Sequence, residues 1–302
     1  MHSSKTLLVL CGPTATGKSG LAQQLAHYLN VPVLNADSRQ VYRGFDIGTA
    51  KPTAQERLEV EHLLIDVADP TENFNAIRYQ ALANTEIERL HREGRVALLV
   101  GGSGLYLRAV SMGLTPPAVP PDPKLRAHLQ PLTASELHHQ LQAQDPDSAR
   151  RIHPNDRVRL ERALEVCLST GQPLSAQQSR HPPDYAVRTI GLCAERSLLT
   201  ERIAARTYRM LARGWLEEVA CLRERYGSDL PLLQTLGYGE LGSHLAGDMS
   251  LEAAIERTII RTRQFAKRQM TWFRADSTIQ WLDISAGEQS LWEQTQRLVD
   301  GL

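Results

Sequence analysis

Residues 10–20 read LCGPTATGKSG, and this stretch decides the fold class. Gly12, Gly17, Lys18 and Ser19 satisfy the pattern G-x-x-x-x-G-K-[ST], which here follows an apolar run and opens an amphipathic segment. In a loop of this kind the backbone N–H groups face one concavity, and the dipole of the following helix adds positive potential. The sequence therefore predicts a phosphate-binding loop between a strand and a helix.

Each residue of this loop is a candidate contact for a diphosphate. The expected contacts are Gly12, Pro13, Thr14, Ala15, Thr16, Gly17, Lys18 and Ser19. We expect the N–H groups from Thr14 to Ser19 to line the concavity, Lys18 to add a full charge, and the Ser19 hydroxyl to ligate Mg²⁺. The loop alone does not say which polyphosphate binds.

Short apolar runs alternate with amphipathic segments over the first hundred residues. TLLVL (6–10), VPVLNAD (31–37), EHLLIDV (61–67) and RVALLVGG (95–102) have the character of buried strands, and residues 19–29 and 75–94 that of helices. This alternation predicts an α/β fold, a P-loop NTPase-like doubly wound parallel sheet. Ligands of such sheets bind at the carboxyl ends of the strands.

The middle of the chain has a different composition. Of the 16 prolines, 11 fall between Pro116 and Pro183, and the segments between them have helical patterns without a long apolar strand. We predict a helical insertion domain over residues 115–185 and a core domain made of residues 1–114 and 186–302. Within the core we expect a returning strand in 186–194, long helices in 195–227 and 251–276, and a last strand near 278–284.

The composition of the chain indicates the cellular compartment in which it works, but it does not identify the substrate. Lys and Arg total 34 and Asp and Glu total 34, so any contact with nucleic acid must come from local patches. Cys11, Cys167, Cys193 and Cys221 form no CxxC pair, which favours a reducing compartment. The apolar run near the N-terminus is too short for a signal sequence or a membrane span. We expect a cytoplasmic monomer.

A second polar stretch follows the second predicted strand. Residues 35–52 read NADSRQVYRGFDIGTAKP, so Asp37 should emerge at the same sheet edge as Lys18, one strand over. Taken alone, Asp37 and Ser38 favour the cap of a turn over a catalytic site.

The motifs together resemble the tRNA dimethylallyltransferase (isopentenyltransferase) family of the bacterial type. The resemblance is carried by the phosphate loop, DSRQVYRGFDIGTAKP, LLVGGSGLY, RIHPNDRVRLERALEV, TLGYGE and TRQFAKRQMTWFR, in the family's order from about residue 7 to about residue 285. It implies transfer of a dimethylallyl group from its diphosphate to N6 of the adenosine 3′ to the anticodon. It also implies Mg²⁺, a P-loop core and a helical insertion that clasps the RNA.

The resemblance implies catalytic roles that can be compared with the chemistry. Asp37 would accept the proton of the adenine amine, and Lys18 and Arg206 would hold the departing diphosphate. Ser103 stands where the family usually has threonine, and its hydroxyl can make the same hydrogen bond with a less restricted χ1. Glu61 and the segment NFNAIRYQ also depart from the family pattern, which leaves the prenyl pocket undefined.

Two basic segments are candidates for RNA contact. One has Arg150, Arg151, Arg157, Arg159 and Arg162, and the other runs from Arg257 to Arg274 and ends beside Trp272 and Phe273. A solvated charged face is the ordinary alternative for both. By the resemblance, the residues expected to contact tRNA are Asp37, Ser38, Arg39, Gln40, Ser103, Arg126, Arg159, Arg162, Gln234, Gly237, Tyr238, Lys267, Arg268, Gln269, Trp272 and Arg274.

Three alternative functions stay open from the sequence. The first is a prenyltransferase for free adenine nucleotides, which the insertion and the basic C-terminal helix disfavour. The second is a small-molecule kinase or NTPase, which is disfavoured because the strand VALLV ends in Gly101 and Gly102 and not in an aspartate. The third is an inactive RNA-binding protein, which is disfavoured because the chain has all of Lys18, Ser19, Asp37 and Arg206.

Overall fold

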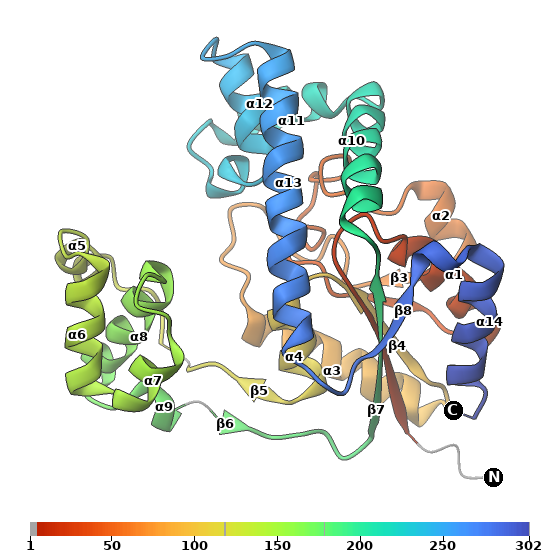
Figure 1. Ribbon diagram of the computed structural model, residues 1–302, viewed down its shortest axis with the longest axis horizontal. Coiled ribbons are helices and arrows are strands. Elements are labelled where there is room, and N and C mark those ends of the chain that lie inside the picture. The colour runs from red at the N-terminus through yellow and green to blue at the C-terminus, as the bar shows by residue number, and fades with distance from the viewer. Residues whose placement is uncertain (1–4, 118, 178, 302) are drawn as a thin grey trace. The chain divides into compact units, whose positions relative to one another are not determined.

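The computed structural model describes residues 5–117, 119–177 and 179–301 (Figure 1). The chain divides into two compact units, Met1–Ser111 with Asp184–Leu302, and Met112–Pro183. The predicted domain ranges also include residues 1–4, 118, 178 and 302, which lie outside the described residues.

The first unit contains a six-stranded sheet in which every pairing is parallel. Its strands are β1 (Thr6–Cys11), β2 (Val33–Asn35), β3 (His62–Leu63), β4 (Ala97–Gly101), β7 (Ala186–Cys193) and β8 (Gln280–Asp283). Their order across the sheet is β3-β2-β4-β1-β7-β8. The predicted α/β fold class is confirmed, including the returning strand at 186–193 and the last strand at 280–283.

Helices cover both faces of this sheet. The helices of the first unit are α1 (Lys18–Leu29), α2 (Ala54–Glu59), α3 (Ala76–Arg92), α4 (Gly104–Ser111), α10 (Arg196–Ala212), α11 (Trp215–Tyr226), α12 (Tyr238–Leu245), α13 (Leu251–Arg274) and α14 (Glu288–Val299). Side chains alternate along a strand, so Leu8 and Leu10 pack with α1 and α14, and Leu7 and Val9 pack with α3 and α4. Figure 1 shows α1 and α14 together on one side of the sheet.

The strand order corrects one expectation about the site. Asp37 follows β2 and Lys18 follows β1, but β4 lies between these two strands, so Asp37 is two strands from the phosphate loop and not one. Consecutive strands of a doubly wound sheet need not be neighbours, because a later strand can insert between them. The turn after β4, which carries Ser103, therefore lies between the phosphate loop and Asp37.

A second expectation fails in the helical part of the core. Residues 195–227 form two helices, α10 and α11, instead of one long helix, and the break lies at Gly214, which has φ 94°. A residue in the left-handed region interrupts the helical hydrogen bonding, and glycine adopts that region without a steric penalty. The amphipathic pattern continues across the glycine, so the pattern alone did not indicate the break.

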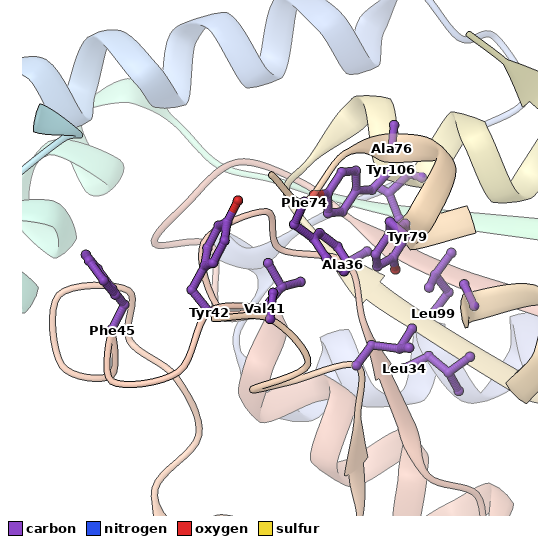
Figure 2. Close-up of a cluster of buried hydrophobic side chains, with 14 of the residues drawn as sticks. Leu34, Ala36, Val41, Tyr42, Phe45, Phe74, Ala76, Tyr79, Leu99 and Tyr106 are labelled. Atoms are coloured by element: carbon purple, nitrogen blue, oxygen red, sulfur yellow. The ribbon is translucent and has the colours of Figure 1, made fainter. Parts of the chain in front are cut away.

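An aromatic core supports the chain that follows β2. Figure 2 shows Phe74, Tyr79 and Tyr106 gathered beside this segment, with Tyr79 stacked on Tyr106 at a ring centroid separation of 4.0 Å. The Tyr79 hydroxyl donates a hydrogen bond to the carbonyl of Asn35 at 2.8 Å. Because Asn35 is the last residue of β2, this contact sets the point from which the chain leaves the sheet toward Asp37.

The second unit is a small helical bundle with its own core. Its elements are β5 (Leu114–Thr115), α5 (Pro123–Leu129), α6 (Ala134–Gln144), α7 (Pro146–Arg151), α8 (Arg157–Thr170), α9 (Leu174–Gln177) and β6 (Ser179–Arg180). Leu137, Leu141, Leu160 and Leu164 are fully buried in this core. The antiparallel pair of β5 and β6 was not expected from the sequence, because two-residue strands carry no periodic signal.

Among the described residues, no helix combines the length and the apolar character that crossing a membrane requires.

Candidate active site

The phosphate loop adopts the conformation that its glycines allow. Gly12 has φ 144°, and a Cβ at this position would lie 2.6 Å from the carbonyl oxygen of Leu192 on β7. Gly17 has φ 86° and precedes the first turn of α1. Ala15, with φ 68°, is left-handed without being a glycine. Such backbone is typical of a loop whose N–H groups turn toward an anion.

Lys18 lies in the first turn of α1 with its ammonium group turned back over the loop. Its Nζ donates to the carbonyl of Pro13 at 2.7 Å, and the Thr16 hydroxyl donates to the same carbonyl at 2.8 Å. Burial and the nearby charge of Arg206 lower the pKa of Lys18 to about 8, although Asp37 opposes this shift. A diphosphate at the loop would favour the protonated form.

Arg206 reaches the same loop from α10. Its guanidinium NH1 donates to the Thr14 hydroxyl at 3.1 Å. Burial lowers the pKa of Arg206, while the carboxylate of Asp37 acts in the opposite direction. The Asp37 carboxylate thus acts to raise the pKa of both Lys18 and Arg206, against the effect of burial.

Asp37 begins the turn that leaves β2. One carboxylate oxygen, Oδ1, accepts hydrogen bonds from the N–H groups of Arg39 at 2.8 Å and Gln40 at 3.4 Å. The residue is only partly buried. The turn cap and the catalytic role considered for Asp37 are thus compatible, because the cap uses Oδ1 and Oδ2 is not needed for it.

Ser103 connects the turn after β4 to the Asp37 segment. The Ser103 Oγ accepts a hydrogen bond from the N–H of Ser38 at 2.8 Å, and its N–H donates to the carbonyl of Ala36 at 3.2 Å. A Cβ on Gly101 would lie 2.1 Å from the same Ala36 oxygen, so the two segments approach too closely for any larger residue. The structure thereby brings Ser103 and Asp37 together.

The structure differs from the sequence-based expectation at Thr14. Its N–H does not point into the loop concavity, because it donates to Oε1 of Gln269 on α13 at 2.9 Å. Gln269 comes from 255 residues further along the chain, and the pairing has no counterpart in the loop motif itself. No local pattern in the sequence indicates this pairing.

A cleft of about 270 Å³ opens beside the loop. Ser19 and Arg206 line it, together with Arg209 and Arg213 from the end of α10. Among the described residues, no group of three or more His, Cys, Asp or Glu side chains is arranged to hold a metal ion. The exposed Ser19 hydroxyl fits a magnesium ion that takes most of its other ligands from phosphate and water.

Two residues that organise the loop after Asp37 were missed from the sequence. Lys51 has a fully buried side chain and pairs with Asp46 and Asp66, the latter at 2.7 Å. Glu218 on α11 accepts hydrogen bonds from the N–H groups of Ile47 at 2.6 Å and Gly48 at 3.1 Å. The Glu218 bonds join segments 171 and 170 residues apart, whereas the Lys51 pairs span 5 and 15 residues without a helical or strand spacing that would indicate them.

The basic residues of α13 that were expected to contact RNA are accessible. Lys267, Arg268 and Arg274 are exposed, and the Arg268 guanidinium lies 5.9 Å from the ring centre of Phe265. A phosphate backbone could therefore contact these three charged side chains on the surface of the protein.

Two other residues of α13 expected to contact RNA have partners within the protein. Gln269 is buried against the phosphate loop. Trp272 is half-buried, with the Arg108 guanidinium 3.9 Å from its ring centre. The helix thus combines a charged outer face with an inner face that packs on the site.

The other expected RNA contacts of the first unit also differ in access. Arg39 and Gln234 are exposed. Gly237 and Tyr238 are buried, and the Tyr238 hydroxyl donates to Glu218 at 2.6 Å. The side chain of Tyr238 therefore packs inside the protein, and its contact with RNA stays a prediction.

Gln40 is also engaged by the protein. Its Nε2 donates to the carbonyls of Thr49 at 3.0 Å and Ala50 at 3.1 Å, which closes the loop that follows Asp37. Its amide thus has a structural role in the free protein, whereas its neighbour Arg39 extends into solvent.

In the second unit, a buried carboxylate holds two of the expected RNA contacts. Glu165 accepts hydrogen bonds from Nε of Arg126 at 2.8 Å and NH1 of Arg162 at 2.6 Å. Burial alone would raise its pKa, but these two arginines and the N–H of Asp122 lower the pKa of Glu165 to about 2. Arg159 is exposed and pairs with Asp156 at 3.2 Å.

The chain is similar to known proteins in its sequence. The model of the IPP transferase family matches residues 40–276. A tRNA dimethylallyltransferase of Gloeobacter violaceus is 60% identical over 296 residues, which cover 98% of each chain. One from a Cyanothece strain is 56% identical over 283 residues, or 94% of each chain.

The chain is also similar to solved structures of transferases with the same kind of name. A tRNA isopentenylpyrophosphate transferase from Bacillus halodurans is 37% identical, with a TM-score of 0.74 over 98% of this chain and 96% of that one. A eukaryotic dimethylallyltransferase acting on tRNA is 31% identical, with a TM-score of 0.76 over 98% of this chain and 78% of that one.

Proposed function

This chain belongs to the IPP transferase family, and from that premise we propose that it transfers a dimethylallyl group from dimethylallyl diphosphate to tRNA. The acceptor is N6 of the adenosine 3′ to the anticodon. One observation carries the proposal: the phosphate loop, the turn of Ser103 and the turn of Asp37 follow the neighbouring strands β1, β4 and β2, with Arg206 bonded to the loop and Ser103 bonded to the Asp37 turn.

The diphosphate side would stabilise the leaving group. As the bond between C1 of the dimethylallyl group and its diphosphate oxygen breaks, negative charge gathers on the diphosphate. Lys18, Arg206 and the N–H groups of the loop oppose that charge in a partly buried environment, where electrostatic interactions are stronger than in water.

The acceptor side would remove a proton. The adenine amine is a weak nucleophile, so N6 must lose a proton as its bond to C1 forms, and the Asp37 carboxylate accepts it. Ser103 accepts a hydrogen bond from Ser38 and keeps its own hydroxyl proton, which it can donate to the base or to the leaving oxygen.

A divalent ion fits the diphosphate side. Mg²⁺ bound by the diphosphate and the Ser19 hydroxyl would supply further neutralisation of the leaving group. Lys18 and Arg206 are the residues of this chain that would neutralise the diphosphate charge alongside the ion.

The acceptor base has to leave its stack to reach Asp37, at a cost of a few kcal/mol. Exposed Lys267, Arg268 and Arg274 on α13 offer phosphate contacts that offset this cost, and Arg126 and Arg162 of the insertion offer others. We further propose that the insertion clasps the RNA and that the protein acts as a monomer in the cytoplasm.

A direct assay tests the function. The purified protein is incubated with unmodified tRNA, dimethylallyl diphosphate and Mg²⁺, and the nucleosides are analysed by mass spectrometry. We expect dimethylallylated adenosine in tRNA, none in AMP supplied in its place, and no release of phosphate from ATP. Modification of AMP instead of tRNA would contradict the proposal in favour of a free-nucleotide prenyltransferase, and ATP hydrolysis alone would favour an NTPase.

A further inference from the structure

The side chain of Gln269 joins two parts of the site that are far apart in the sequence. Its Oε1 accepts a hydrogen bond from the N–H of Thr14 in the phosphate loop at 2.9 Å. Its Nε2 donates to the carbonyl of Gly102, in the turn after β4, at 2.9 Å. The amide oxygen of Gln269 thus bonds to the phosphate loop, and its amide nitrogen bonds to the turn that carries Ser103.

This contact is tight as well as specific. Gln269 is 9% exposed. A Cβ on Gly102 would lie 2.5 Å from Gln269 Nε2, and a Cβ on Gly104 would lie 2.4 Å from the ring of Trp272. The helix α13 therefore packs against Gly102 and Gly104 so closely that a side chain at either position would clash. The amide of Gln269 has little freedom to move.

Both partners of Gln269 adjoin groups that act in the proposed reaction. Thr14 also accepts a hydrogen bond from Arg206 through its hydroxyl, at 3.1 Å. Gly102 precedes Ser103, which binds the N–H of Ser38 next to Asp37. A displacement of the Gln269 amide would therefore change the spacing between the diphosphate cations and the acceptor residues.

We propose that Gln269 is a positioning residue that sets the alignment of the prenyl donor with the acceptor base. It acts through Thr14 and Gly102 and not by touching either substrate, and this inference rests on the proposed function. Reactions that join two bound substrates depend strongly on their spacing, and a misplacement of about 1 Å can cost roughly 10²-fold in rate. The loss should therefore appear in turnover more than in binding.

The test compares Gln269→Met with the natural chain. Methionine is close to glutamine in size but can make neither hydrogen bond. We expect the single-turnover rate, with both substrates saturating, to fall roughly 10- to 100-fold. We expect the KM for dimethylallyl diphosphate, the Kd for tRNA and the melting temperature to change little. Gln289→Met, at an exposed position of α14, is the matched control.

A second variant approaches the same contact from the other side. Gly102→Ala places a methyl group against the Gln269 amide, so it should lower the same rate with a similarly small effect on KM. Because both substitutions disturb one contact, the double variant should lose less than the product of the two single losses.

The outcomes separate this inference from the proposed function. If the natural chain does not prenylate tRNA, the proposed function fails and the inference fails with it. If the natural chain is active and Gln269→Met keeps its full rate, only the positioning role is wrong. A variant with a normal rate but weakened tRNA affinity would make Gln269 an RNA contact and would likewise overturn the inference.

Discussion

The Oγ of Ser103 accepts a hydrogen bond from the N–H of Ser38 at 2.8 Å, which ties the turn after β4 to the turn that begins with Asp37. Ser103→Ala removes this acceptor and the donor that the hydroxyl offers to a substrate. We expect the single-turnover rate to fall by roughly 10-fold, the order of one lost hydrogen bond. Ser103→Thr restores the hydroxyl with a more restricted χ1 and should match or exceed the natural rate. A rate for Ser103→Ala equal to that of the natural chain would show that the hydroxyl is not needed.

Asp37→Asn separates the turn cap from proton transfer. Asparagine retains an oxygen that can accept from Arg39 and Gln40, so the turn should persist, but the amide is a poor base. We expect kcat to fall by roughly 10² to 10⁴ while the affinity for dimethylallyl diphosphate stays nearly constant. Rapid-quench kinetics and donor binding by calorimetry measure the two effects. Full turnover in this variant would remove Asp37 from the chemistry.

The lowered pKa of Lys18 predicts a pH dependence for donor binding. The free protein carries the charge on Lys18 below about pH 8 and loses it above that value. Because the diphosphate binds the charged form, the affinity for the donor should be level below pH 8 and should fall by up to about 10-fold per pH unit above it. Lys18→Arg keeps its charge throughout and should lack this decline. Equal profiles for both proteins would exclude Lys18 as the titrating group.

Lys267 and Arg268 should contribute salt-dependent affinity for RNA. We expect Lys267→Ala with Arg268→Ala to weaken tRNA binding and to reduce the slope of log K against log salt by up to about 2. Donor affinity should not change. Arg92→Ala with Arg297→Ala removes the same charge from exposed positions on α3 and α14 and serves as the control. Equal losses in the two double variants would indicate a general charge effect and not a specific surface.

Glu165 should stabilise the insertion and orient Arg126 and Arg162. Its pKa is lower in the folded protein than in the unfolded chain, so its contribution to stability is complete above about pH 4.5 and is lost as the pH falls toward 2. Glu165→Gln removes the charge that pairs with the two arginines, which are themselves partly exposed and can be solvated, so the loss in the free energy of unfolding should be about 1 kcal/mol. Urea unfolding at neutral and acidic pH measures this loss. A variant as stable as the natural chain at neutral pH would contradict it.

Local features of the sequence were sufficient for part of the fold and part of the site. The loop LCGPTATGKSG and the strands around it predicted an α/β core, because hydrophobic periodicity and glycine placement act over a few residues. The proline-rich stretch between Pro116 and Pro183 indicated a separate helical segment. Asp37 and Ser103 could be named from their motifs, and their catalytic roles stay predictions that the experiments above test.

Long-range contacts could be known only from the folded chain. The sequence by itself determined that a phosphate loop begins the core and that polar residues follow two of its strands. Only the tertiary structure decided that β4 lies between β1 and β2, that Tyr238 is buried, and that Gln269 takes the N–H of Thr14. The physical reason is that strand order and side-chain partners depend on packing between segments that can lie hundreds of residues apart, and no local propensity encodes that packing.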